Sequence, residues 1–166
     1  MPNIILIGMP ASGKSTVGVI LAKTLGIGFV DTDLIIQQRE KRLLQDIINT
    51  DGIERFLDCE AAAVKSLDCD NCVIATGGSV IFRHDAVEHL KKNGIIFYLN
   101  VPLNEIKKRL NNISTRGIAA KNGESVDDIF NERSTLYEKY ADVILTFDDC
   151  SAEQTVEKIC KHINKK

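Results

Sequence analysis

At 166 residues the chain is long enough to bury one sizeable core, so we expect a single domain. A formal net charge of −2, with 27% charged and 44% hydrophobic residues, is ordinary for a globular protein. This balance gives no indication of a nucleic-acid partner or of binding to a membrane, and no apolar run approaches the length of a membrane span.

The first predicted elements surround a glycine-bounded loop at residues 8–15. The loop follows an apolar run at 4–7 and precedes a helical pattern at 16–25. This order of strand, loop and helix is typical of the phosphate-binding P-loop, and it favours that motif over a chance glycine- and serine-rich turn. Backbone N–H groups and the helix N-terminus would then face the phosphates of a nucleoside triphosphate. The residues expected to bind this nucleotide are Gly8, Met9, Pro10, Ala11, Ser12, Gly13, Lys14, Ser15 and Thr16.

Two side chains of this loop have distinct expected roles. The Lys14 ammonium would reach the outer phosphates as a point charge and stabilise the charge that develops during transfer. The Ser15 hydroxyl would be a ligand of Mg²⁺. We therefore expect ATP and Mg²⁺ to bind here.

Beyond the loop, apolar runs alternate with helical patterns. Strands are predicted at 28–30, 72–75, 95–99 and 143–145, and helices at 34–50 (broken), 53–67, 86–92, 103–110, 126–140 and 152–163. Nearly all-apolar strands that alternate with helices are typical of a parallel sheet covered on both faces. We predict an α/β, three-layer α/β/α P-loop NTPase fold. Its five-stranded parallel sheet has the P-loop strand in the centre, within one kinase domain at 1–166.

Polar residues follow three of these strands, and ligands of open parallel sheets bind beyond such strand ends. Asp31 and Asp33 follow the second strand, where the alternative role is capping of the next helix. We expect Asp31 to hold the Mg²⁺ shell through water. Asp33 is placed to accept a hydrogen bond, and a proton, from an acceptor hydroxyl.

The third strand ends in Gly77, Gly78 and Ser79. These residues could form a plain turn. The interpretation we favour is that the glycines let a small substrate approach the backbone and accept hydrogen bonds from its N–H groups.

The stretch at 111–123 is polar, contains glycine and lacks periodicity. A solvated loop is one reading. A phosphate-transfer enzyme must exclude water, however, and a mobile basic lid does this. Arg116 would then stabilise the transferring phosphoryl group.

Five cysteines are present, in a chain whose first residues lead directly into the loop and leave no room for a signal peptide. We therefore expect a cytoplasmic protein with reduced thiols. Cys69 and Cys72 have the spacing of a metal or redox pair. A structural zinc site needs four ligands, and no second pair exists, so two thiols in a turn is the favoured interpretation.

Several segments resemble the shikimate kinases over nearly the whole chain. They are 13–18 (Gly-Lys-Ser-Thr-Val-Gly), 29–33 (Phe-Val-Asp-Thr-Asp), 75–78 (Ala-Thr-Gly-Gly) and the residues Glu132, Arg133, Leu136, Tyr137, Glu138, Ala141 and Asp142. The resemblance implies that Asp31 belongs to the Mg²⁺ site and that Asp33 and Arg133 contact the acceptor. It also implies that Arg116 is the phosphate-contacting arginine of the lid and that Arg109 packs on adenine, where a guanidinium plane can stack on a base.

The sequence also departs from the pattern of this family. Leu57 stands where the family usually has an arginine that grips the substrate carboxylate, and we expect it to present an apolar wall to that group. Arg55 is a candidate replacement. Ser79 replaces a third glycine, Pro10 and Ala11 stand where Met-Gly is usual, and the lid begins Arg-Gly-Ile-Ala rather than Arg-Pro-Leu-Leu.

The favoured function is therefore phosphorylation of shikimate, or a similar small hydroxylic carboxylate, by a monomeric enzyme. Two alternatives remain open at this point. One is a kinase for another acceptor, such as a sugar acid, a hydroxy acid or a nucleotide. The other is a nucleotide-binding protein without catalytic activity, which the retained Lys14, Ser15 and Asp33 disfavour.

Overall fold

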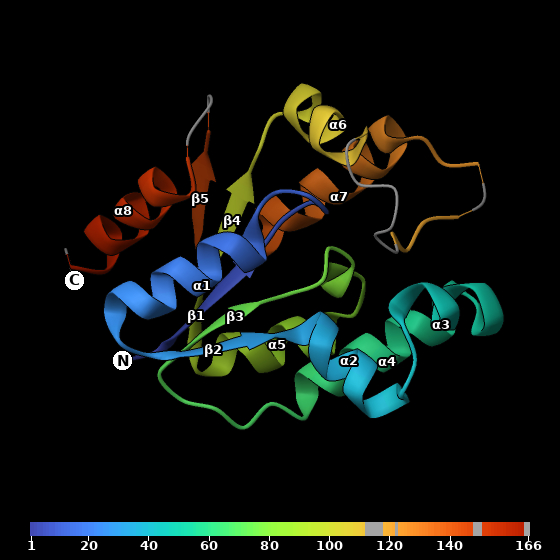
Figure 1. Ribbon diagram of the computed structural model, residues 1–166, viewed down its shortest axis with the longest axis horizontal. Coiled ribbons are helices and arrows are strands. Elements are labelled where there is room, and N and C mark those ends of the chain that lie inside the picture. Colours follow the sequence, from blue (N-terminus) through green and yellow to red (C-terminus); the bar gives the residue numbers. More distant parts are fainter. Residues whose placement is uncertain (112–117, 122, 148–150, 165–166) are drawn as a thin grey trace.

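A computed structural model describes residues 1–111, 118–121, 123–147 and 151–164. Five strands form one parallel sheet in the order β2-β3-β1-β4-β5 (Figure 1). The strands are β1 (Asn3–Ile7), β2 (Gly28–Asp31), β3 (Cys72–Ala75), β4 (Gly94–Asn100) and β5 (Val143–Thr146). The prediction of a five-stranded parallel sheet with the P-loop strand in the centre is confirmed.

Helices cover both faces of this sheet (Figure 1). α1 and α8 pack together on one face, and α5 and α7 contact β4 from the other. The helices are α1 (Lys14–Leu25), α2 (Thr32–Glu40), α3 (Leu44–Asp51), α4 (Ile53–Lys65), α5 (His84–Lys92), α6 (Leu103–Asn111), α7 (Val126–Tyr140) and α8 (Ala152–Ile163), with a short 3₁₀ turn η1 (Val80–Phe82). Among the described helices, none has the length and apolar character needed to cross a bilayer.

The main core forms around β1. Ile4, Ile5, Leu6 and Ile7 are each at most 1% exposed, because β1 has a strand on either side and helices above and below. A strand buried on both faces needs apolar side chains at consecutive positions rather than at alternate ones. This requirement explains why the apolar run at 4–7 predicted the strand correctly.

A second, smaller core joins α2, α3 and α4. It is the α2–α4 cluster, made of Ile36, Ile47, Phe56, Leu57, Cys59, Ala63 and Ala119. The predicted broken helix at 34–50 is two helices in the structure, because Lys41 adopts a left-handed conformation with φ of 54° and ends α2. The turn η1 was not predicted from the sequence.

Candidate active site

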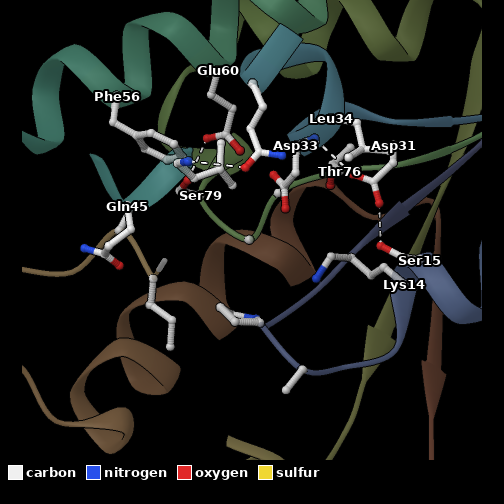
Figure 2. Close-up of a pocket in the computed structure, with 18 of the residues that line it drawn as sticks. Lys14, Ser15, Asp31, Asp33, Leu34, Gln45, Phe56, Glu60, Thr76 and Ser79 are labelled. Atoms are coloured by element: carbon white, nitrogen blue, oxygen red, sulfur yellow. Dashed lines mark hydrogen bonds between the residues drawn. The ribbon is translucent and has the colours of Figure 1, made fainter. Parts of the chain in front are cut away.

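The ends of β1, β2 and β3 converge, as predicted, on one cavity of about 370 Å³. Its lining includes Lys14 from the loop after β1, Asp31 from the end of β2 and Gly77 from the loop after β3. Figure 2 shows the Asp33 carboxylate and the Lys14 ammonium facing the same space. The three neighbouring strands thus bring together polar groups that are far apart in the sequence.

The loop between β1 and α1 has the backbone conformation of a tight phosphate-binding turn. Gly13, with φ of 90°, is the N-terminal cap of α1. At Gly8 a side chain is excluded, because a Cβ there would lie 2.9 Å from the carbonyl oxygen of Leu99. Ala11 also has a positive φ, of 63°. A glycine, which the shikimate kinases usually have at this position, adopts that conformation without the cost of about 1 kcal/mol that alanine carries.

Lys14 is held at the mouth of this loop. Its ammonium donates hydrogen bonds to the carbonyl oxygens of Gly8 at 2.9 Å and Met9 at 2.8 Å, and to the Ser12 hydroxyl at 3.4 Å. The side chain is buried and lines the cavity. A cation fixed in this way lies beside the backbone that would surround the phosphates, so the role predicted for Lys14 fits its position.

The two residues assigned to the metal lie in direct contact. The Ser15 hydroxyl donates a hydrogen bond of 2.6 Å to Oδ2 of Asp31 (Figure 2). Oδ1 of Asp31 accepts from the backbone N–H of Asp33 at 3.0 Å, and Asp31 is the N-terminal cap of α2. The capping role considered for this position is therefore confirmed for Asp31. A hydroxyl and a carboxylate oxygen are hard ligands, and this donor set fits Mg²⁺ completed by phosphate and water oxygens.

On the acceptor side, Asp33 and Arg133 line the same cavity from α2 and α7. Arg133 is only 2% exposed. Its guanidinium donates to the carbonyl oxygen of Ala119 and stacks over the Phe82 ring at 5.3 Å from the ring centroid. A buried guanidinium that is fixed by these contacts is suited to bind an anionic group of a ligand.

Gly77 and Gly78 keep this part of the cavity open. A Cβ at Gly77 would collide with Oε1 of Glu60, and one at Gly78 would lie 2.9 Å from Cδ of Pro10 and 3.2 Å from Nη1 of Arg133. The N–H of Gly77, which we expected to donate to a substrate, donates instead to the Thr32 hydroxyl at 3.1 Å. The Gly77 position is thus explained by close packing against Glu60.

Glu60 is a site residue to which the sequence assigned no role. It is 1% exposed on α4 and accepts a hydrogen bond of 2.6 Å from the Ser79 hydroxyl (Figure 2). Its other oxygen, Oε1, has no hydrogen-bond partner among the described residues. Burial, together with the nearby charge of Asp33, raises the pKa of Glu60 to about 7. The sequence did offer one signal, because Glu60 lies three residues after Leu57, as a glutamate does in the family pattern. The burial of its side chain could not be predicted, since it depends on tertiary packing.

This raised pKa predicts that the free energy of unfolding decreases as pH rises from about 4.5 to about 7. Across that window the unfolded chain ionises Glu60 before the folded protein does, and so it binds fewer protons. The decrease is on the order of 3 kcal/mol and complete once the folded carboxyl has ionised. Glu60→Gln should lack this component. Urea unfolding of both proteins should show the variant gaining stability relative to wild type as pH rises, whereas a pH-independent difference would contradict the assignment.

Leu57 does not lie where the sequence indicated. The side chain is 5% exposed and belongs to the α2–α4 cluster with Ile36 and Ile47, and it is not part of the cavity wall. The expectation of an apolar wall at this position was therefore wrong. Arg55 does not replace the missing cation, because it is exposed on α4 and does not line the cavity. Among the described lining residues, Lys14 and Arg133 carry the positive charges.

A second cavity, of about 260 Å³, lies beside the P-loop and includes Arg109. The Arg109 guanidinium donates to the carbonyl oxygen of Ala11 at 3.2 Å and to Glu105 at 3.0 Å. Val101 and Phe147 give this cavity apolar walls. Its place next to the loop and its flat cation fit the predicted contact of Arg109 with adenine. Arg116, the predicted lid arginine, lies outside the described residues.

A parallel sheet whose central strand leads into a P-loop, with an acceptor cavity beside the loop, defines the small-molecule kinases of the P-loop class. A family model described as shikimate kinase matches residues 10–164. The chain belongs to the shikimate kinase family.

Individual relatives agree with this result. A shikimate kinase from Thermodesulfovibrio yellowstonii is 35% identical over 168 residues, which cover 99% of this chain and 96% of the relative. The structure of a shikimate kinase from Acinetobacter baumannii in complex with shikimate matches with a TM-score of 0.86 and 28% identity, covering 99% of this chain and 94% of that one. Threonine synthase-like 1 of Mus musculus is 36% identical over 95% of this chain, which corresponds to 21% of that longer protein.

Proposed function

We propose that the protein transfers the γ-phosphoryl group of ATP to a hydroxyl of shikimate. The observation that supports this most strongly is that Asp33 and Arg133 line one cavity with Lys14. An acceptor that carries both a carboxylate and a hydroxyl would bind Arg133 through its carboxylate and Asp33 through its hydroxyl. Its hydroxyl would then face the phosphates at the P-loop.

Each of these residues would have a separate role in the transfer. Lys14 would bind the transferring phosphoryl group and neutralise part of its charge. Asp33 would accept the proton of the attacking hydroxyl. Ser15 and Asp31 would hold Mg²⁺, which supplies charge neutralisation at the phosphate oxygens when bound. Arg116 would add positive charge from the lid.

The charged side chains around the acceptor side lead us to expect modest affinity for shikimate. With Leu57 in the core, Arg133 is the cation that lines the acceptor side in the described part of the chain, and the carboxyl groups of Asp33 and Glu60 line the same cavity. Loss of one charged hydrogen-bond partner costs about 1.5–3 kcal/mol, or roughly ten- to more than hundredfold in affinity. Shikimate should therefore bind more weakly here than in relatives that have a second arginine.

The assay that tests this function follows ADP release from ATP on addition of shikimate. Methyl shikimate is the matched control, because it keeps the hydroxyls and removes the negative charge that Arg133 would bind. We expect shikimate-dependent ADP release and a lower kcat/KM for the ester. If shikimate and its ester gave no ADP release and another hydroxylic metabolite did, the acceptor would belong to a different class.

Leu57→Arg should tighten shikimate binding. An arginine can run its apolar stem along the α2–α4 cluster and place its guanidinium near Glu60, three residues further along α4. We expect a dissociation constant about tenfold lower by titration calorimetry. Leu57→Met keeps the volume without a charge and should leave affinity unchanged. A folded Leu57→Arg protein with no gain would argue against a carboxylate beside α4.

The segment at 111–123 is proposed to be the lid over bound substrates. Of the described residues in it, Ile118 and Ala119 line the cavity. Hydrogen exchange of this segment should slow when shikimate and a non-hydrolysable ATP analogue bind together. The peptide that spans α5 provides the control, because no residue of α5 lines either cavity. Equal protection of 111–123 with and without ligands would count against a lid.

ATP as the phosphate donor, Mg²⁺ as the metal, the cytoplasmic location and the monomeric state are part of this proposal and stay predictions. Size-exclusion chromatography with light scattering would test the last of these.

A further inference from the structure

The cysteine pair at 69 and 72 lies where β3 begins, at the end of that strand away from Gly77 and the cavity. The backbone bends at Asp70 and Asn71, and Asn71 has a positive φ of 59°. Both cysteines are free thiols and half-buried. The segment therefore places two half-buried cysteines on either side of a two-residue bend.

The buried side chain of Asn3 fixes both ends of this bend. Its amide Nδ2 donates to the carbonyl oxygen of Cys69 at 2.7 Å, and its Oδ1 accepts from the backbone N–H of Cys72 at 2.9 Å. One amide group thus holds the two cysteines from the neighbouring strand β1. These hydrogen bonds already restrict the backbone between the two cysteines, so less conformational entropy is lost when a disulfide forms.

The position of the Cys72 sulfur depends on Gly28 in β2. A Cβ at Gly28 would lie 2.6 Å from Sγ of Cys72, so this sulfur occupies space that only a glycine leaves open. The Cys72 thiol points back along the bend and contacts the carbonyl oxygen of Asp70 at 3.4 Å. The Cys69 thiol lies close enough to Cys72 for that neighbour to raise its pKa.

We propose that Cys69 and Cys72 form a thiol–disulfide exchange site that reacts with small-molecule disulfides. The Cys72 thiolate attacks a disulfide RSSR, forms a mixed disulfide and releases one thiolate, which takes up a proton. The Cys69 thiolate then attacks Sγ of Cys72, closes the protein disulfide and releases the second thiol. The protein dithiol loses two electrons and two protons, and RSSR is reduced to two RSH.

The surroundings of the pair favour the disulfide over a metal. The part of the chain that the structure describes holds no group of three or more histidine, cysteine, aspartate or glutamate side chains that could bind a metal ion. Burial, and then the neighbouring Cys72, raise the pKa of Cys69 to about 11. Because burial disfavours the thiolate of Cys69, the reduced pair gains no stability from that thiolate, and the disulfide is comparatively stable.

The exposed carboxylates of Asp68 and Asp70 flank the pair and set a preference among disulfides. They attract a cationic disulfide and repel an anionic one at low ionic strength. Cystamine should therefore react faster than glutathione disulfide. Asp70→Asn should reduce this difference without preventing the reaction.

The test uses reduced full-length protein incubated with cystamine, followed by alkylation, trypsin and mass spectrometry. Cleavage after Lys65 and Arg83 places both cysteines in one peptide, separate from Cys59, Cys150 and Cys160. We expect this peptide to lose two hydrogen atoms and to resist alkylation. In Cys69→Ser the reaction should stop at a cystamine adduct on Cys72, and Cys160→Ser should behave as wild type.

A second comparison isolates the folded geometry from the spacing alone. The native protein should form the disulfide at a ratio of cystamine to reduced thiol about tenfold lower than the same protein in urea, because the hydrogen bonds of Asn3 act only in the fold. Equal ratios in both states would overturn the proposal. The proposal would also be overturned if, in the native protein, both cysteines of the peptide 66–83 were alkylated, or if that peptide carried cystamine adducts without an internal disulfide. None of these readouts depends on kinase activity.

Discussion

Replacing Lys14 by alanine should reduce kcat by about 10²–10³-fold, the loss typical for removal of one fixed group that stabilises transition-state charge. The ammonium is held by the carbonyl oxygens of Gly8 and Met9 and lies next to the loop that would surround the phosphates. Its removal leaves those oxygens at a cavity that water can enter, so the fold should survive. The expected change is therefore in turnover far more than in stability.

Steady-state kinetics and urea unfolding, measured on the same preparations, separate these two effects. Lys23→Ala is the matched control, because Lys23 is an exposed lysine in the last turn of the same helix, α1. It should keep wild-type kinetics. Near-normal kinase activity in Lys14→Ala would show that the role assigned to Lys14 is wrong.

Replacing Asp33 by asparagine should lower kcat by about 10²–10⁴-fold, which is the usual contribution of a positioned general base. The amide has the same shape but cannot take the proton of the acceptor hydroxyl. The substitution leaves the backbone N–H of Asp33 unchanged. This group still donates its hydrogen bond to the Asp31 carboxylate, so the N-terminal cap of α2 should persist. The loss should appear mainly in kcat, because an amide can still form hydrogen bonds with a hydroxyl.

The control for this variant is Asp46→Asn, an exposed aspartate in the first turn of α3. Kinetics with shikimate should show no change there. If Asp33→Asn changed KM alone and left kcat intact, Asp33 would bind the acceptor without acting as its base.

Much of the nucleotide side could be predicted from the sequence because it depends on local features. The P-loop is a contiguous motif between β1 and α1, and the strands are short apolar runs whose type follows from burial on both faces. Asp31 and Asp33 could be placed at the cavity because parallel strands end at the same edge of a sheet. The left-handed conformation of Ala11 could not be predicted, since alanine rarely adopts it.

The acceptor side could be predicted less well because its geometry arises from packing between distant segments. Glu60 is buried because α4 packs against the loop of Gly77, which the sequence of α4 does not reveal. Leu57 turns into the α2–α4 cluster because α2 and α3 supply Ile36 and Ile47 there. The direction of a side chain on α4 thus depends on where two other helices lie.

These two residues together define what is unusual about the acceptor cavity. A core leucine stands where the resemblance to the shikimate kinases leads us to expect an arginine. The neighbouring buried glutamate has one oxygen with no hydrogen-bond partner among the described residues. Burial raises the pKa of Glu60 to about 7, so this carboxyl is partly neutral near neutral pH. A neutral carboxyl repels a bound carboxylate less than an ionised one, which offsets part of the missing positive charge.

The most direct test of the central claim is the identity of the phosphorylated product. Wild-type protein is incubated with ATP, Mg²⁺ and shikimate, and the mixture is followed by phosphorus NMR together with mass spectrometry of the small molecules. We expect a new phosphate monoester with the mass of shikimate plus one phosphoryl group, formed in equal amount with ADP. ADP with inorganic phosphate and no monoester, or no shikimate-dependent ADP at any concentration, would contradict it.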